Sequence, residues 1–417
     1  MRLTSSATKA ATDGVNRLTA RWAAELEPTA HTVFSAAGVW PLLALMLDGA
    51  DGPARAELEA AVGVPAQDAA QAALELLAAL DAMEGVRSAV GLWAAPGLPL
   101  REEWSGRLPA GALGRFSGDQ AADQRALDAW AHDRTDGMIE SMPAEAGEDT
   151  ELVLAAAQAV RTQWAKPFAP SATVPASGPW AGREVAVLSR TATGLEDVSV
   201  AATADGPLTV VTVRGGAGVD VRLLLGAPDA GPSAVLQGGL AAHAGACPTV
   251  PGDGFSDGSP GPGLEVRTVE AHRPDPTLAL RTMPFDLTAG HDLLLHGALF
   301  GLTAAMDATR GHFPGISARP LAVGSARQSA MASFDARGFR AASVTAIAAR
   351  AGSAPPPRAP YTAQRVQAVL DRPFGFLTVH RASGLVLTAG WIAEPTPASA
   401  DARARIGRPP HRPGGER

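Results

Sequence analysis

The chain has 417 residues, of which 46% are hydrophobic and 18% are charged, so it is long and apolar enough to bury a large core. Its net charge of -7, with no cluster of Lys and Arg before the C-terminal tail, argues against a nucleic-acid partner. Cys247 is the only cysteine, which excludes an internal disulfide and any multi-cysteine metal site. We therefore expect a globular protein that needs no metal and no cofactor.

The first third of the chain is predicted to be mainly helical. Apolar residues recur with helical spacing in four segments, and Gly63 is placed to end the third of them. A strand and a further amphipathic helix follow, with Gly137 near the end of that helix. The predicted helices span residues 15–26, 39–47, 54–62, 67–83 and 123–141, and the strand spans residues 88–94.

Strands are predicted to dominate the rest of the chain. Residues 152–163 form a long apolar run without alternation, which is typical of a strand buried on both faces. Two β-rich runs, 208–213 and 219–225, flank a Gly-rich turn and predict a hairpin. Helices are expected at 233–244 and 296–300. Residues 251–263 and the tail after Pro395 are rich in Gly, Pro and polar residues and are predicted to be irregular.

The chain shows no composition break that would separate two domains. We place one mixed domain at residues 12–395 and expect disordered termini at 1–11 and 396–417. The N-terminus lacks the apolar core of a secretory signal, and no run of 18 apolar residues occurs. These absences favour a cytoplasmic protein with no membrane span.

Motifs for catalysis are present only without their structural context. Ser256 lies in a G-x-S-x-G pattern, but both flanks are Gly- and Pro-rich loop instead of a strand and a helix, so a hydrolase is a remote alternative. Ser6 and Lys9 match S-x-x-K at the terminus, with no partner motif after them. The nine histidines form no pair at metal-ligand spacing. The sequence predicts a protein that is not an enzyme.

Five segments resemble the serpin family and occur in the family's order. They correspond to the entry into the core helix, the helix after it, the helix across the main sheet, the third strand of that sheet and the C-terminal hairpin. The abundance of Ala and Arg is typical of an actinobacterial-type, bacterial sequence. The matching segments are 33–49, 54–58, 128–139, 153–168 and 371–395, and the resemblance spans roughly residues 12–395, nearly the whole chain.

The resemblance implies a mixed α/β (α+β) fold with helices around a large five-stranded sheet, two smaller sheets and an exposed reactive-centre loop. It also implies a serine protease inhibitor, an endopeptidase inhibitor that acts as a suicide substrate. The protease cuts the loop and forms an acyl-enzyme, and the cut loop enters the main sheet as a new strand. The implied partner is a serine protease of subtilisin or trypsin type, and the implied inhibitor is a monomer. A non-inhibitory serpin that carries a ligand is the alternative, and many relatives act outside the cell.

The hinge of the implied loop begins at Gly338, whose backbone freedom suits a pivot between strand and loop. Family inhibitors usually have Thr and then Glu after this glycine, where this chain has Phe339 and Arg340. Burial of Phe339 would gain about 1.5–3 kcal/mol, and forcing a ring into a small slot would cost about 1–3 kcal/mol, so the two effects nearly cancel. The hinge residues are Gly338, Phe339, Arg340, Ala341, Ala342, Ser343, Val344 and Thr345.

The family's spacing, about fifteen residues from the hinge glycine, places the reactive bond between Gly352 and Ser353. Arg350 and Ala351 form the alternative bond, because a trypsin-like specificity pocket binds Arg by charge pairing. Residues 353–370 are longer than is usual in the family.

The resemblance also locates a region that controls opening of the main sheet. Ser35 stands where the family has serine. Gly38 replaces a second serine of the family, Ala156 replaces an asparagine and Gln328 replaces a histidine. We therefore expect a smaller or different hydrogen-bond network there. The residues are Ser35, Gly38, Ala156, Trp164 and Gln328.

Overall fold

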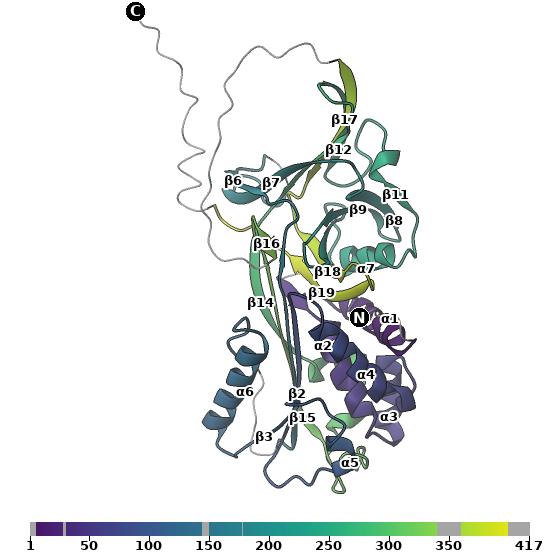
Figure 1. Ribbon diagram of the computed structural model, residues 1–417, viewed down its shortest axis with the longest axis vertical. Helices are drawn as coiled ribbons and strands as arrows, with labels where there is room; N and C mark the ends of the chain where they lie inside the picture. Colours follow the sequence, from purple (N-terminus) through teal and green to yellow (C-terminus); the bar gives the residue numbers. More distant parts are fainter. Residues whose placement is uncertain (1–5, 28–30, 144–149, 177, 340–359, 399–417) are drawn as a thin grey trace, which may run out of the picture.

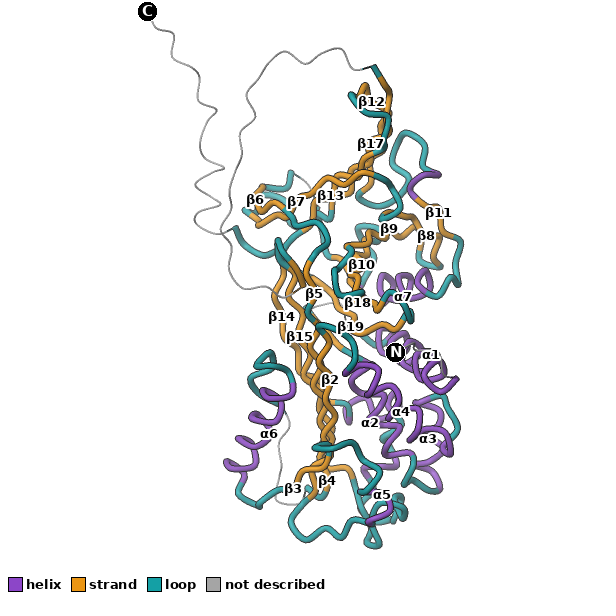
Figure 2. The backbone as a smooth tube through the Cα atoms, in the orientation of Figure 1, coloured by secondary structure: helices purple, strands orange, loops and turns teal. Residues whose placement is uncertain are grey.

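The computed structural model describes residues 6–27, 31–143, 150–176, 178–339 and 360–398. Figure 1 shows a tall sheet in the lower half, with a group of helices on one face and α6 alone on the other. Two further sheets occupy the upper half, in which Figure 2 shows mostly strands, with α7 at one side. The mixed fold with three sheets that the sequence predicts is confirmed.

The predicted helices are present, with shifted ends. Gly63 ends α3 in the left-handed conformation (φ 72°), as expected. The helix across the sheet, α6, ends earlier than predicted because Asp136 and Gly137 both take positive φ, 52° and 72°. The helices are α1 Ser6–Ala24, α2 Ala36–Leu47, α3 Gly52–Val62, α4 Ala66–Asp81, α5 Glu102–Ser105, α6 Gln120–Arg134, α7 Pro232–His243 and α8 Gly297–Phe300.

The tall sheet, called the large sheet below, has five strands in the order β3-β2-β4-β15-β14, and two-residue strands β16 and β5 are added at one end. β4 and β15 pair in parallel at the centre, and their common edge is called the seam. The strands are β2 Val86–Ala94, β3 Leu113–Arg115, β4 Leu152–Val160, β5 Thr162–Gln163, β14 Phe285–Asp292, β15 Val323–Phe334 and β16 Gly338–Phe339.

β4 is buried along all nine residues, as its lack of alternation predicts. Leu154 and Ala156 belong to the main core, whereas Val153 and Ala155 belong to a second cluster with Leu127 of α6. The seam is therefore covered on both faces. Any new strand that enters it would be shielded from water at once.

The second sheet has the order β1-β19-β18-β10-β9-β8-β11 and contains the predicted hairpin, β9 with β10. The third has the order β12-β17-β13-β7-β6. The strands of the second sheet are β1 Thr32–Phe34, β8 Val198–Thr203, β9 Gly206–Val213, β10 Val219–Leu225, β11 Thr249–Pro251, β18 Phe374–His380 and β19 Leu385–Ile392. The strands of the third sheet are β6 Ala169–Thr173, β7 Val185–Thr193, β12 Leu264–Ala271, β13 Thr277–Thr282 and β17 Tyr361–Val369.

The ordered fold extends past both predicted boundaries. α1 begins at Ser6 because residues of its first turns, such as Thr8, are already buried. At the other end, the Ala186 amide donates to the Thr396 carbonyl (2.9 Å), so the chain after Pro395 lies along β7. Residues 251–263 are irregular as predicted, apart from the end of β11 and a 3-10 turn at 252–254, but they are held in place, since Gly258 and Val266 exchange two backbone hydrogen bonds.

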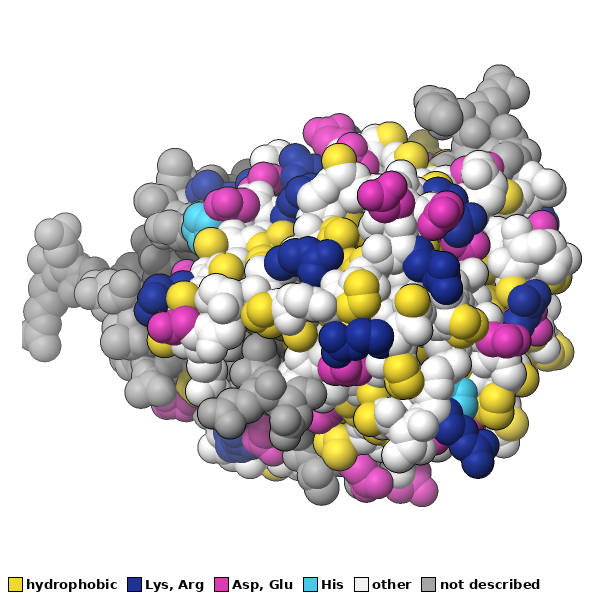
Figure 3. Space-filling view, turned by 90° about the horizontal axis from the view of Figure 1, so that it is seen from below, with side chains coloured by type: hydrophobic (Ala, Val, Ile, Leu, Met, Phe, Trp, Pro, Cys, Tyr) yellow, Lys and Arg dark blue, Asp and Glu magenta, His cyan; other side chains and the backbone are white. Residues whose placement is uncertain are grey.

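Hydrophobic, basic and acidic side chains are mixed on the lower end of the molecule, which Figure 3 shows end-on. None of the helices in the described part of the chain is both long and apolar enough to cross a membrane.

Candidate functional site

The candidate site is the upper end of the seam, where β16 enters the large sheet. Gly338 and Phe339 pair antiparallel with Gln163 and Thr162 of β5, and Phe339 also pairs with Phe334 of β15. β16 therefore lies between the end of β15 and the continuation of β4. Below it, β4 and β15 pair directly, beginning at Ala330 and Gln158.

Glycine is required at position 338 by close packing. A Cβ atom there would lie 2.4 Å from the Thr162 carbonyl oxygen, a distance that no side chain tolerates. The next residue, Phe339, is 0% exposed, and its ring centroid lies 6.2 Å from that of Phe376. The ring that the sequence suggested would have to be forced into the sheet is already seated in the core.

Trp164 holds the turn that sends the chain from β15 into β16. Its indole Nε1 donates to the Asp335 carbonyl (2.8 Å), and its backbone amide donates to the Arg337 carbonyl (2.8 Å). Within the turn, the Asp335 carboxylate accepts from the Arg337 and Gly338 amides at 2.7 and 3.0 Å. The Trp164 ring packs on Phe334 with centroids 4.6 Å apart. The structure thus places Trp164 directly beside the hinge.

Ser35, Gly38 and Gln328 come together lower on the seam, as the resemblance implies. Both groups of the Gln328 side-chain amide bond to the Ser35 backbone: Nε2 donates to the carbonyl (2.7 Å), and Oε1 accepts from the amide (2.9 Å). The Ser35 hydroxyl donates to the Leu387 carbonyl (2.6 Å) and accepts from the Gly38 amide (3.1 Å), which caps α2. Gln328 thereby ties β15 to the first turn of the core helix.

Ala156 does not take part in this network, although it pairs with Gln328 across the seam. Gln158, two residues further along the same face of β4, is the polar residue beside it. A Cβ atom at Gly38 would be 3.4 Å from both the Gln158 Oε1 and the Gln328 Nε2 atoms, so the missing side chain at Gly38 makes room for them. The Gln158 amide is buried and has no partner among the described residues. Its signal in the sequence was a single polar residue within an apolar strand.

His291 of β14 lies behind this network. Its Nε2 donates to the Val33 carbonyl (2.8 Å), and its ring meets Trp22 edge-on with centroids 5.1 Å apart. Burial in this apolar setting lowers the pKa of His291, although the bond to Val33 partly opposes the shift. The folded protein therefore favours the neutral imidazole more than the unfolded chain does.

The first part of the chain matches a known family model. Residues 12–177 match the model described as Serpin (serine protease inhibitor). A structure of native protease nexin-1 with heparin superposes with a TM-score of 0.71 at 17% identity, covering 93% of this chain and 100% of that chain. The chain has the serpin fold.

Two further solved structures agree with this identification. A serpin from the trematode Schistosoma haematobium gives a TM-score of 0.68 at 13% identity, over 93% of this chain and 100% of that one. Human thyroxine-binding globulin complexed with thyroxine gives 0.69 at 15%, over 93% and 98%. A comparison with curated proteins found no match. The serpin resemblance of the sequence is thus confirmed.

Part of the implied serpin site lies outside the described residues. This holds for six of the eight hinge residues and for both candidate reactive bonds, and these assignments stay predictions. The residues concerned are Arg340, Ala341, Ala342, Ser343, Val344, Thr345, Arg350, Ala351, Gly352 and Ser353.

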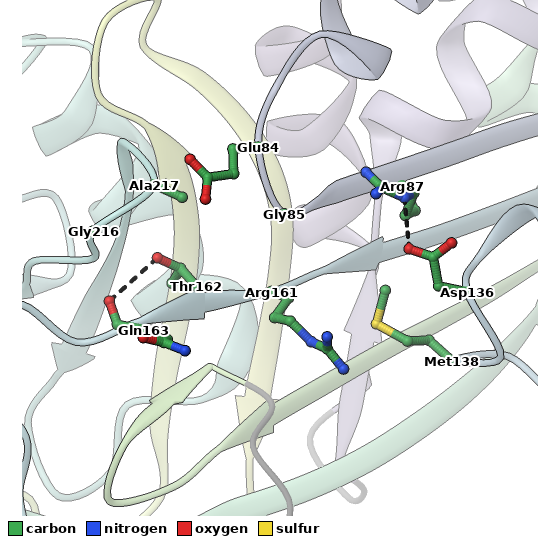
Figure 4. Close-up of a pocket in the computed structure, with 10 residues that line it drawn as sticks. All are labelled: Glu84, Gly85, Arg87, Asp136, Met138, Arg161, Thr162, Gln163, Gly216 and Ala217. Atoms are coloured by element: carbon green, nitrogen blue, oxygen red, sulfur yellow. Dashed lines mark hydrogen bonds and ion pairs between the residues drawn. The ribbon is translucent and has the colours of Figure 1, made fainter.

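A pocket of about 380 Å³ lies beside β5 (Figure 4). It adjoins the edge of β5 that does not pair with β16. Arg87 of β2 and Asp136, which follows α6, form an ion pair at its edge (2.8 Å) and tie the end of that helix to the sheet. Arg161 and Glu84 add one charge of each sign to the lining. The described residues show no group of three or more His, Cys, Asp or Glu that could hold a metal ion.

The weak catalytic motifs of the sequence have structural explanations in this fold. Ser256 follows the single 3-10 turn of residues 252–254 and precedes no helix, so the strained elbow of a hydrolase is not formed. Lys9 of the S-x-x-K motif lies on α1 and pairs with Asp13 one turn later (2.8 Å), a common surface contact.

Proposed function

We propose that the protein inhibits serine proteases by offering residues 340–359 as a substrate and then inserting the cut segment into the large sheet. The position of β16 carries this proposal. β16 is antiparallel to both β15 and β5, and it lies at the upper end of the seam. A chain that continued from Phe339 in the same direction would run down the seam, antiparallel to both of its neighbours.

The exchange of hydrogen bonds favours such an insertion. The seam is now a parallel ladder of seven residue pairs, from Val323 with Leu152 to Ala330 with Gln158. A strand between β4 and β15 would replace it with two antiparallel ladders, which are slightly more stable per residue. Large side chains do not face one another along most of the seam, because six of its seven residue pairs contain Ala or Ser. Insertion thus has a driving force and a low steric barrier.

The seated ring of Phe339 sets the faces of the entering strand. Because this ring points into the core, alternation would direct Ala341, Ser343 and Thr345 to the same side and Arg340 to the other. Small side chains would then enter the core. The charge of Arg340 would lie on the face that carries α6.

The proposal predicts a covalent product with a target protease. The protein is incubated with trypsin-, subtilisin- and elastase-like serine proteases and run on a denaturing gel. A band at the summed mass that survives SDS supports inhibition, and cleavage between residues 340 and 359 without that band contradicts it.

Arg350→Ala tests which residue the protease recognises, and Arg358→Ala is the matched control in the same segment. If Arg350→Ala alone loses the complex, and only with trypsin-like proteases, the reactive bond is the one after Arg350. If Arg350→Ala still forms the complex with these proteases, the bond between Gly352 and Ser353 is favoured.

A carrier function is the second candidate, and a pocket motivates it. This pocket, of about 580 Å³, lies between α1, α7 and the turn at Ser383 and Gly384. His243 in its lining donates Nε2–H to the Gly384 carbonyl (2.7 Å), and its buried Nδ1 atom has no partner among the described residues. Titration with thyroxine, the ligand in one of the similar structures, tests this candidate by calorimetry. Saturable binding that His243→Phe abolishes, together with no protease complex, would favour a carrier.

A further inference from the structure

β17, which follows the segment that contains both candidate bait bonds, is held between two strands. β12 pairs antiparallel with it over eight residue pairs, and β13 pairs parallel with it over five. β12 and β13 follow one another in the sequence, so β17 occupies the slot between the two arms of one arch. Figure 1 shows β12 alongside β17 at the top of the molecule. Withdrawal of β17 would break both ladders together.

Further bonds fix this arrangement from the outer side. The Gln364 side chain of β17 donates to the Phe255 carbonyl (2.8 Å), and the Val369 amide donates to the Gly263 carbonyl (2.9 Å). The Asp257 carboxylate accepts from the amide and the hydroxyl of Thr268 at 3.0 and 2.9 Å. Residues 254–263 thus back β12 and occupy part of an edge that would otherwise be open to another strand.

Chain length explains why the hold on β17 matters. Residues 340–360 connect Phe339 in the large sheet to Tyr361 at the start of β17. A strand advances about 3.3 Å per residue, and an extended chain reaches at most about 3.6 Å per residue. Each residue that entered the seam of the uncut protein would therefore need another to return to β17. Beyond about half of this segment, entry would pull β17 from its slot.

We propose that β12 and residues 254–263 form a clasp on β17 that restricts full insertion to the cut chain. The inference rests on the proposed function and adds a regulatory device to it. While β17 stays paired with β12 and β13, the uncut protein keeps residues 340–359 accessible to a protease. It cannot lose inhibitory activity by inserting the uncut segment into the large sheet. A cut removes the constraint, because the part that inserts is no longer joined to β17.

Val269→Pro is the test variant. The Thr268 and Val266 amides donate outward, to Asp257 and Gly258, so the alternation of an antiparallel strand directs the Val269 amide toward Ala363 of β17. Proline at 269 removes that donor. Glu270→Pro is the matched control, because alternation directs the Glu270 amide outward and it makes none of the bonds to residues 254–263 named above, so the donors facing β17 are left in place. Uncut proteins are held at 37 °C, intact mass is checked, and the fraction with raised thermal stability is followed.

The wild type and Glu270→Pro should stay unconverted, and Val269→Pro should convert at least about tenfold faster. A disulfide from Glu270→Cys and Thr362→Cys, which lie opposite one another on β12 and β17, should stop the conversion until it is reduced. A folded Val269→Pro variant that converts no faster than wild type overturns the clasp, as does conversion that the disulfide fails to stop. If Val269→Pro does not fold, Gln364→Ala is judged by the same criteria.

The protease-cut wild type separates failure of the clasp from failure of the proposed function. A cut wild type that gains thermal stability while uncut Val269→Pro does not convert would overturn the clasp alone. A cut wild type that gains none would overturn the insertion mechanism and the clasp with it.

Discussion

Replacing Phe339 with alanine should lower the stability of the uncut and the cut protein by the same amount. The side chain is 0% exposed, and its ring packs near Phe376 in the uncut structure. Truncation of a buried phenylalanine costs about 3–5 kcal/mol. Since the ring is seated before any cut, this loss applies to both forms. If the cut segment inserts as proposed, the stability gained on cleavage should therefore remain unchanged.

The assay is urea unfolding of the uncut and the protease-cut protein, with the ratio of covalent complex to cleaved product as a second readout. Phe313→Ala is the matched control, because Phe313 is also buried (1% exposed) and lies in the segment that bonds to Arg101 beside α5. Both variants should lose similar stability. Only Phe339→Ala should lower the ratio, because its loop no longer starts from a seated residue. A loss confined to the cut form would refute this reasoning and show that the ring enters the sheet only after cleavage.

Three further predictions concern the polar groups behind the seam. Gln328→Ala leaves the buried amide of Ser35 unpaired, at a cost of about 1–3 kcal/mol, so an unchanged urea midpoint would contradict the network. Gln158→Leu removes an amide without a partner and should stabilise the uncut protein by about 1–3 kcal/mol, whereas a loss of stability would show that the amide is bonded. Because burial lowers the pKa of His291, the unfolded chain takes up a proton near pH 6.5 before the folded protein does. Stability should be complete above this pH and fall below it by up to about 1.4 kcal/mol per pH unit, until the lowered folded-state pKa is reached. His291→Gln should reduce that slope, and an identical slope would refute the assignment.

Local patterns in the sequence were sufficient for most helices and for the central strand. α3 could be predicted because its apolar spacing and Gly63 lie within a few residues of one another. β4 could be predicted because burial on both faces removes alternation, which is a property of one segment alone. The five segments that resemble serpins then supplied the expectation of one large sheet and two smaller sheets.

Features that depend on contacts distant in the sequence could not be predicted. Residues 251–263 are rich in Gly and Pro, and they are held by bonds from β17, about a hundred residues away, which run from Gln364 to Phe255 and from Val369 to Gly263. The place of β17 between β12 and β13 is set by pairing between strands about a hundred residues apart. At the seam, the family pattern pointed to Ala156, but the fold brings Gln158 to Gly38 and Gln328.

The crystal structure of the protein cut between residues 340 and 359 tests the central claim most directly. In the uncut protein, Ala330 and Gln158 are partners on neighbouring strands. Insertion predicts that the chain after Phe339 forms a strand between them, which would roughly double the strand spacing from about 4.8 Å. A cut protein in which Ala330 and Gln158 remain paired, with no strand after Phe339, would contradict the account.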